Sequence, residues 1–489
     1  MLGCVQVIAG FAAFLFLLFH IHRRRCCRDP LLPDWPLFGM LPPILKNLGQ
    51  INDYATRVLR RNGGTGNFLG PWFTGMNYLA TSDPTNVHHM MSKNFANYIK
   101  GPVFREIFEA FGDGIFTADS DSWKHHRALL HSLFKTKSFE KLLEKIVQKK
   151  MDKSLVPLLD HVERRGIEVD LQDVFNRLNF DIICSTILGS DPESLAIDFP
   201  EVACERAFNE AEEFIFYRHT VPISIWKLQR WLRIGPEKKM AEACEVFDRF
   251  LHESIASKRE KLNKDNEKDR ENDDLLTCLM REKEGKEHVD DKFLRDTAFN
   301  LFVAGRDTIT SALTWFFWLV AKHPSVEAKI LEEIKEEKET KSQVYLHGAL
   351  CEALRLYPPI PFERKQAVEH DILPSGHEVG PGTMILLSLY AVGRCEEVWG
   401  KDCMEFKPER WISKKGSIVH IPSYTFISFN AGPRTCLGKD LSFIQMKIVA
   451  SSILKDYQVH IVKDHPISPS LSIVLLMRYG LKVWITKRN

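Results

Sequence analysis

The stretch FNAGPRTCLG, from Phe429 to Gly438, decides how the rest of this sequence is interpreted. It places one cysteine, Cys436, between Gly432 and Gly438, with Arg434 two residues before it. Glycine permits a positive φ and the close approach of a flat ligand. A cysteine at a helix start beside a cation has its thiolate favoured, and such a thiolate can ligate iron. This stretch therefore predicts a thiolate site for an iron-containing ligand, with Arg434 suited to an anionic group on it.

Two charged motifs precede this stretch. Glu352 and Arg355 are three residues apart, so they meet on one helix face. Further on, FKPERW at 406–411 supplies Arg410. An isolated E-x-x-R is more often a surface ion pair. The family resemblance described below implies that these charges support the cysteine loop, and their order and distance before Cys436 agree with it.

A long apolar stretch at 290–320 contains no proline and predicts a buried helix. Within it, Ala304 and Thr308 are four residues apart and share a face, with Gly305 and Asp307 between them. A threonine hydroxyl can bond to the carbonyl four residues earlier, and a glycine there loosens the helix. The pattern predicts a groove in the helix beside Thr308.

Together these patterns resemble the cytochrome P-450 family. The F-x-x-G-x-R-x-C-x-G loop, the E-x-x-R helix and the A-G-x-D-T motif are complete, and the resemblance covers nearly the whole chain. It implies a mainly α fold with a small β-rich region, for which β-branched runs at 383–389 and 473–485 are candidates. Trp411 replaces the phenylalanine usual after P-E-R, and the segment 335–343 is shorter than usual.

The resemblance also assigns roles to residues. It implies haem b (iron protoporphyrin IX) as cofactor, Cys436 as the metal ligand, and Thr308 with Asp307 as the catalytic pair that delivers protons to dioxygen. The residues expected to bind the cofactor are Trp123, Arg127, Ala304, Arg364, Phe429, Gly432, Arg434, Cys436 and Gly438. Trp123 and Arg127 form a W-x-x-x-R pair expected at one haem propionate, with a surface cation–π pair as the alternative. Arg364 is expected at the other propionate.

The N-terminus predicts a membrane anchor. No residue from Met1 to Ile21 is formally charged, and a helix of this length spans about 30 Å of hydrocarbon. The arginines that follow the apolar run, Arg23, Arg24, Arg25 and Arg28, keep the rest of the chain cytosolic. A cleaved signal peptide, the alternative, carries its charge before the apolar run.

The expected organisation has three parts. We expect a single-pass anchor at 1–22, a basic and proline-rich linker at 23–45, and a haem-binding monooxygenase domain at 46–489. The family resemblance places the anchor in the endoplasmic reticulum membrane, in contact with lipid, with the catalytic domain in the cytosol. The net charge of +2 gives no strong field for nucleic acid, and none is expected as a partner. The 11 cysteines include no C-x-x-C pair, which argues against a zinc site or a disulfide framework.

The substrate is inferred from finer resemblance. The runs YLHGAL at 345–350 and LPSGH at 373–377 resemble plant fatty-acid and alkane hydroxylases, and most of all the mid-chain alkane hydroxylases. The implied reaction inserts one oxygen atom of O2 into a C–H bond of a small apolar substrate, a long-chain alkane or fatty acid. The sequence has no Gly-rich nucleotide motif, so electrons are expected from NADPH through NADPH–cytochrome P-450 reductase.

By analogy with the family, the candidate cavity-lining segments are 100–117, 214–218, 301–304, 360–362 and 471–475. They contain seven phenylalanines, which favour a long apolar guest, although ordinary core is the more common role for any one of them: Phe104, Phe108, Phe111, Phe116, Phe214, Phe216 and Phe362. Two other functions remain open. One is an enzyme that hydroxylates or oxidatively couples a phenolic alkaloid precursor, since these rings also suit an aromatic guest. The other is a non-catalytic haem-binding protein, against which the intact Asp307–Thr308 pair argues.

Overall fold

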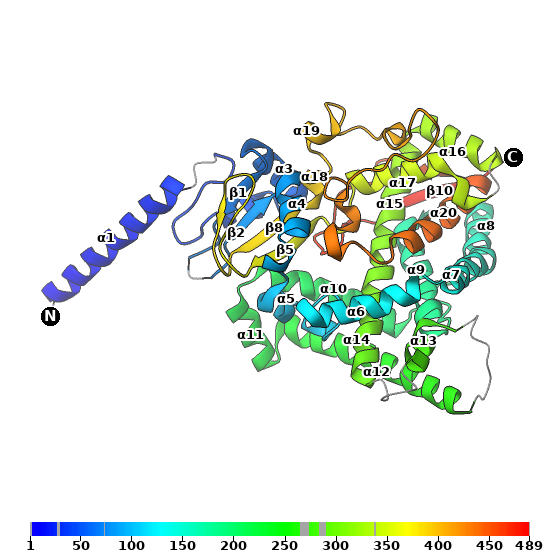
Figure 1. Ribbon diagram of the computed structural model, residues 1–489, viewed down its shortest axis with the longest axis horizontal. Coiled ribbons are helices and arrows are strands. Elements are labelled where there is room, and N and C mark those ends of the chain that lie inside the picture. The colour runs from blue at the N-terminus through cyan, green and yellow to red at the C-terminus, as the bar shows by residue number, and fades with distance from the viewer. Residues whose placement is uncertain are drawn as a thin grey trace.

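A computed structural model describes residues 2–26, 30–72, 74–264, 273–282, 290–336 and 339–488. Helices form most of the body; the largest group of strands lies on the side nearer the N-terminus, and the last strand lies beside the C-terminus (Figure 1). The expectation of a mainly α fold with a small β-rich region is therefore confirmed. Arg28, and residues 337 and 338 of the segment 335–343, lie outside the described residues.

The helices of the N-terminal half are α1 Leu2–Cys26, α2 Leu41–Lys46, α3 Ile51–Arg61, α4 Pro84–His88, α5 Gly101–Ile107, α6 Ser120–Phe134, α7 Lys137–Lys150, α8 Val156–Arg165, α9 Leu171–Leu188, α10 Ala203–Thr220, α11 Ile223–Leu232 and α12 Gly235–Lys264. Those of the C-terminal half are α13 Leu275–Glu282, α14 Asp291–Gly305, α15 Asp307–Lys322, α16 Pro324–Glu336, α17 Val344–Leu356, α18 Leu389–Val392, α19 Glu396–Trp399 and α20 Lys439–Asp456.

The strands are β1 Thr65–Phe68, β2 Tyr78–Thr81, β3 Tyr98–Ile99, β4 Val169–Asp170, β5 Phe362–Ala367, β6 Asp371–Ile372, β7 Glu378–Val379, β8 Met384–Ser388, β9 Tyr457–Ile461 and β10 Lys482–Lys487. The largest sheet has the order β1-β2-β8-β5-β3, antiparallel except where β2 runs parallel to β8. A second sheet has the order β4-β10-β9, and β6 pairs with β7. The run expected at 383–389 is thus a strand, whereas most of the run at 473–485 precedes β10.

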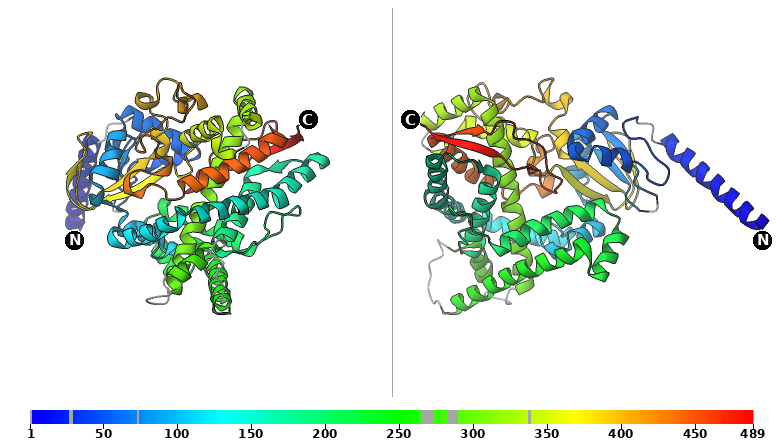
Figure 2. Two further views of the ribbon diagram at one scale, coloured as in Figure 1. Left: turned by 45° about the vertical axis from the view of Figure 1, so that its right-hand side comes forward. Right: turned by 180° about the vertical axis from the view of Figure 1, so that it is seen from behind.

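The main core surrounds α15, which packs against α9 and α17, while α20 packs against α7. Both views of Figure 2 show α14 and α15 in succession through the middle of the helical body. The break between them at Arg306 coincides with the predicted groove. The side chain of Asp290 caps the start of α14, and α17 ends where Pro358 and Pro359 follow it.

The first helix, α1, extends away from the body in Figures 1 and 2. Within the described parts of the chain, no helix has both the length and the apolar character needed to cross a bilayer. The single-pass anchor expected at 1–22 is therefore not shown.

Candidate active site

The cysteine loop lies between a short 3-10 turn at Ile427–Phe429 and the start of α20. Gly432 has a φ of 62°, and a Cβ there would lie 1.8 Å from the carbonyl oxygen of Met91, so glycine is required. The backbone N–H of Cys436 donates to the Phe429 carbonyl at 2.8 Å. The loop is therefore held in a tight turn that ends in the helix following Cys436.

The Cys436 thiol is surrounded by protein, yet its side chain is accessible from a cavity that it lines. Burial raises the pKa of this thiol, whereas the Gly438 N–H and the charges of Arg127 and Lys439 lower it. A metal cation bound to the sulfur would add to the groups that favour the thiolate. The sulfur is thus positioned as a ligand directed into the cavity.

The cavity has a volume of about 320 Å³. Eight of the residues predicted to form the site line it: Trp123, Arg127, Ala304, Thr308, Phe429, Arg434, Cys436 and Gly438. Within the described residues, Asp307, Arg364 and Gly432 are not part of its lining. The cavity thus brings together residues that are distant in the sequence, from α6, α14, α15 and the cysteine loop.

Cationic groups gather along one side of this cavity. The guanidinium carbons of Arg434 and Arg127 lie 4.8 Å and 5.6 Å from the centre of the Trp123 ring. Arg434 Nη2 donates to Asp119 Oδ1 at 2.8 Å, and Arg127 Nη2 donates to the Thr435 carbonyl at 2.8 Å. The W-x-x-x-R pair is therefore directed toward the cysteine loop.

Two lysines that the sequence motifs did not indicate belong to the same region. Lys100 lines the cavity and forms an ion pair with Glu363 at 2.6 Å. Lys365 lies 3.5 Å from the same carboxylate, and burial lowers the pKa of Lys365 to about 7. Burial alone would raise the pKa of Glu363, but the charges of Lys100, Lys365 and Arg434 lower it to about 2. No local motif marks these residues, because the pairing of β3 with β5 brings Lys100, which follows β3, to Glu363 and Lys365 on β5.

Arg364 lies apart from these cations. Its Nη2 is 2.6 Å from Met384 Sδ, and its guanidinium lies 5.2 Å from the centre of the Tyr78 ring. Successive side chains of a strand point to opposite faces, so Arg364 on β5 points away from Glu363 and Lys365. The structure does not bring Arg364 to the other predicted propionate ligands.

The predicted groove lies at the junction of α14 and α15. Thr308 Oγ1 donates to the Ala304 carbonyl at 2.5 Å, four residues earlier. Gly305 is tightly enclosed, since a Cβ there would lie 2.5 Å from Ile183 Cδ1. Ala304 and Thr308 line the cavity, whereas Asp307 is buried and paired with Arg306 at 3.0 Å.

In comparisons with known proteins, residues 30–483 match the family described as cytochrome P-450. The chain is a cytochrome P-450. It is 42% identical to an Arabidopsis thaliana protein named alkane hydroxylase MAH1, over 100% of this chain and 99% of that protein. It is 41% identical to noroxomaritidine synthase from Narcissus aff. pseudonarcissus MK-2014, over 99% and 96%. It is 38% identical to cytochrome P-450 86B1 of Arabidopsis thaliana, over 98% and 89%.

The cofactor of this P-450 is haem b, and the residues present fit it. The Cys436 thiol lines the cavity and can ligate the iron. The charged groups of Arg127, Arg434 and Lys100 line the same cavity and suit the two carboxylates of the porphyrin. Arg434 Nε and Lys365 Nζ are buried and have no hydrogen-bond partner among the described residues. These orphaned donors are consistent with an anionic group that completes the site.

The E-x-x-R motif of this P-450 forms a buried network beneath the cysteine loop. Glu352 accepts from Arg355 at 2.8 Å and contacts Arg410 at 3.3 Å. Trp411 Nε1 donates to Glu352 Oε2 at 2.8 Å. The tryptophan that stands in place of the usual phenylalanine therefore adds a hydrogen-bond donor that a phenylalanine lacks. Ser428 Oγ donates to the Leu354 carbonyl at 2.8 Å and so joins the motif helix α17 to the loop.

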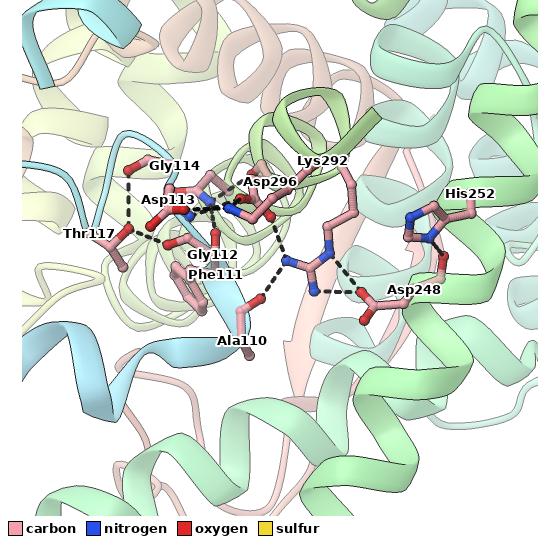
Figure 3. Close-up of polar contacts among 12 residues, drawn as sticks. Ala110, Phe111, Gly112, Asp113, Gly114, Thr117, Asp248, His252, Lys292 and Asp296 are labelled. Atoms are coloured by element: carbon pink, nitrogen blue, oxygen red, sulfur yellow. Dashed lines mark hydrogen bonds and ion pairs between the residues drawn. The ribbon is translucent and has the colours of Figure 1, made fainter. Parts of the chain in front are cut away.

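A second polar network holds loop 110–117 against α14 (Figure 3). Asn300 accepts from the Phe116 N–H at 3.0 Å and donates to the Phe111 carbonyl at 2.8 Å. Asp296 accepts from the Asp113 N–H at 2.9 Å. Phe116 and its neighbour Ile115 line the cavity, so this network positions part of the cavity wall.

Three of the five candidate segments, 100–117, 301–304 and 360–362, contribute to the cavity lining, whereas no described residue of 214–218 or 471–475 does. Of the seven named phenylalanines, Phe116 alone is part of the cavity lining in the described residues, which also includes Phe134, Phe139 and Phe429. Phe104, Phe108 and Phe111 instead pack on one another, with ring centres 4.3 Å and 5.1 Å apart. Their aromatic character alone does not distinguish core from cavity wall.

Proposed function

We propose that this cytochrome P-450 inserts one oxygen atom of O2 into a C–H bond of a long-chain alkane or fatty acid. The observation that carries the proposal is one cavity in which Cys436 and Thr308 share walls with apolar side chains such as Ile115, Leu301 and Ile360. Such walls bind an alkyl chain by excluding water, without a polar anchor. The likeness to a protein named alkane hydroxylase supports the same substrate class.

The overall reaction is R–H + O2 + NADPH + H⁺ → R–OH + H2O + NADP⁺. Haem supplies the activation of dioxygen, and Cys436 tunes it as the thiolate ligand. Thr308 holds its hydroxyl at the cavity wall, and Asp307 next to it supplies the protons. Ile115 and Phe116 orient the C–H bond and keep bulk water away.

We further propose that electrons reach this enzyme from the membrane-bound NADPH–cytochrome P-450 reductase, docked on the face nearest Cys436. Membrane attachment through residues 1–22 belongs to the same proposal. Its supports are the absence of formal charge from Met1 to Ile21 and the exposure of apolar side chains on α1 such as Phe11 and Phe14. These features favour contact with lipid of the endoplasmic reticulum, with the body in the cytosol.

A second candidate is the hydroxylation or oxidative coupling of a phenolic alkaloid precursor. The likeness to proteins named noroxomaritidine synthase favours it. The rings of Phe116 and Phe134 in the cavity wall would also suit an aromatic guest. A non-catalytic haem binder is set aside, because the chain belongs to an enzyme family.

The substrate classes are separated by incubating microsomes that contain this protein and reductase with a long-chain alkane, a fatty acid and a phenolic amine. An alcohol formed from the alkane or the fatty acid, dependent on NADPH and absent with Cys436→Ala, supports the proposal. Product from the amine alone would replace it with the second candidate.

The proton path is tested with Thr308→Ala. The variant should keep the haem and divert much of the NADPH consumed into hydrogen peroxide, because the hydroxyl at the cavity wall is lost. The matched control is Thr314→Ala, since Thr314 makes the same hydroxyl-to-carbonyl bond at 2.7 Å on α15 but is not part of the cavity lining. Full coupling in Thr308→Ala would contradict the assignment.

A further inference from the structure

A buried polar cluster lies behind Asp307, where α10 packs beside the junction of α14 and α15. It joins Arg306 and Asp307 to three side chains of α10: Glu205, Asn209 and Glu212. These three are spaced i, i+4 and i+7, so they share one face of the helix. Neither Arg306 nor Asp307 belongs to the cavity lining in the described residues, which places the cluster next to the cavity but outside it.

Arg306 is the central cation of the cluster and is completely buried. It donates to Asn209 Oδ1 at 2.6 Å, to Asp307 Oδ1 at 3.0 Å and to Glu205 Oε1 at 3.0 Å. Its charge is therefore directed at the carboxylates of Glu205 and Asp307. Glu212 is a further carboxyl group, and no ion pair joins it to a cation in the described residues.

Two oxygens of the cluster have no hydrogen-bond partner among the residues that the structure describes: Glu212 Oε1 and Asp307 Oδ2. Ionised carboxylates only accept hydrogen bonds, so two of them cannot satisfy each other. The side chains of Glu212 and Asp307 are nevertheless within hydrogen-bond reach of each other. A proton held between the two groups resolves this contradiction, since one carboxyl group then donates to the other.

The environment decides which of the two carries that proton. Burial raises the pKa of Glu212 well above its usual range, and the neighbouring charge of Asp307 raises it further. The charge of Arg306 lowers the pKa of Glu212, but the Arg306 guanidinium contacts the carboxylate of Asp307 and not that of Glu212. Glu212 is therefore the partner that holds the proton at neutral pH.

We propose that Glu212 is the immediate proton donor to Asp307 and the first buried station of the proton path to Thr308. This inference rests on the path through Asp307 and Thr308 proposed above. In the step, the O–H bond of Glu212 breaks as an O–H bond to Asp307 forms. Asp307 then passes the proton on toward the Thr308 side of the helix, and Glu212 regains a proton from solvent. No electron moves among these residues.

The protonation state is tested directly by infrared spectroscopy of the purified, haem-loaded protein at neutral pH without substrate. Wild-type protein should show the carbonyl stretch of a buried protonated carboxyl group, and Glu212→Gln should lose it. The control Glu213→Gln changes the exposed neighbour on α10 and should keep the band. A band that persists in Glu212→Gln would overturn the proposal.

Turnover provides the second readout, with a long-chain alkane as the probe and reductase present. Glu212→Gln should form product about tenfold more slowly or worse, with more hydrogen peroxide per NADPH and a larger solvent deuterium isotope effect. Glu212→Asp, which retains an acid, should recover part of the rate, and Glu213→Gln should match wild type. Wild-type turnover and isotope effect in Glu212→Gln would overturn the proposal.

The two proposals fail differently. If Thr308→Ala uncouples turnover while Glu212→Gln does not, the path through Thr308 stands and the role of Glu212 falls. If Glu212→Gln yields no haem-loaded protein, the wild-type spectrum decides, because absence of a protonated carboxyl band at neutral pH would exclude the shared proton.

Discussion

At the scale of single residues, the chemistry depends on the sulfur of Cys436 and the groups that hold it. Gly432 permits the turn, the Phe429 carbonyl accepts from the cysteine N–H, and Arg127 favours the thiolate. Each of these contacts affects either the orientation of the Cys436 side chain or the charge on its sulfur. Substitutions here should therefore change a spectroscopic signature more than the fold.

Cys436→Ala should abolish the red-shifted Soret band of the reduced, carbon monoxide-bound protein, because alanine offers no thiolate to the iron. The measurement is a difference spectrum of purified protein. Cys395→Ser is the control, since Cys395 donates to Glu397 at 3.1 Å on the surface and a hydroxyl can do the same. A normal band in Cys436→Ala, or its loss in the control, would contradict the assignment of the ligand.

At the scale of elements, short polar side chains decide how neighbouring segments are held. Asn300 is completely buried on α14 and binds loop 110–117 through both ends of its amide. Glycines at 112 and 114 allow this approach, since a Cβ at either would lie within 2.3 Å of Asp296 or Asn300. The loop thus depends on α14 for its position, and so does Phe116.

Asn300→Ala should loosen this loop, because it removes two hydrogen bonds to backbone groups of the loop and a third to the Asp296 carbonyl on α14, and leaves those groups buried. Amide hydrogen exchange should become faster across residues 111–117, and hydroxylation should spread over more positions of the substrate. Thr297→Ala is the control on the same helix, since the buried Thr297 hydroxyl has no hydrogen-bond partner in the part of the chain that the structure describes. Equal exchange rates in Asn300→Ala and Thr297→Ala would show that the amide does not hold the loop.

A pH effect is expected where α17 meets α20. His347 stacks on Phe443 with ring centres 4.2 Å apart, and burial, followed by the charges of Lys447 and Lys439, lowers the pKa of His347 to about 4. The unfolded chain binds this proton near the ordinary pKa of about 6.5, so stability present above pH 6.5 is lost as pH falls toward 4. The loss amounts to at most about 3 kcal/mol.

The test compares unfolding midpoints between about pH 7 and pH 4 for wild type and His347→Phe, which retains an aromatic ring but cannot titrate. His347→Phe should lose less stability on acidification, whereas His420→Gln, at an exposed position, should follow wild type. Parallel curves for all three proteins would contradict this assignment.

At the scale of the whole molecule, α1 lies outside the core of the body and contacts it through the rings of Phe16 and Phe19, which pack on Trp72. The buried core clusters contain no described side chain of α1, and Figure 1 shows the helix extending away from the sheet. The cavity and its polar networks are likewise built from residues of the body. Folding and haem binding should therefore be separable from any attachment to a membrane.

Removing residues 2–26 should leave the carbon monoxide spectrum intact and shift the unfolding midpoint by no more than about 2 °C. The truncated protein should leave the membrane fraction, where the full-length chain is expected to remain. Retention of the truncated protein on membranes would show that other surfaces carry the attachment. A large fall in the midpoint would show that α1 supports the fold.

The sequence alone indicated the family, the candidate iron ligand and the interruption of the helix beside Thr308, because each depends on residues close together in the chain. It also indicated the helix of Glu352 and Arg355, but not that Trp411 donates to the same carboxylate. Local spacing specifies turns, caps and helix faces, and these patterns do not depend on tertiary contacts.

Tertiary structure alone decided the contacts between distant segments. Lys100 meets Glu363, Arg364 points away from the other cations, and Glu212 reaches Asp307 only because separate elements pack side by side. The same packing put most of the expected cavity phenylalanines into the core. Burial is a property of the assembled molecule, and it is burial that turns an ordinary glutamate into a group able to hold a proton at neutral pH.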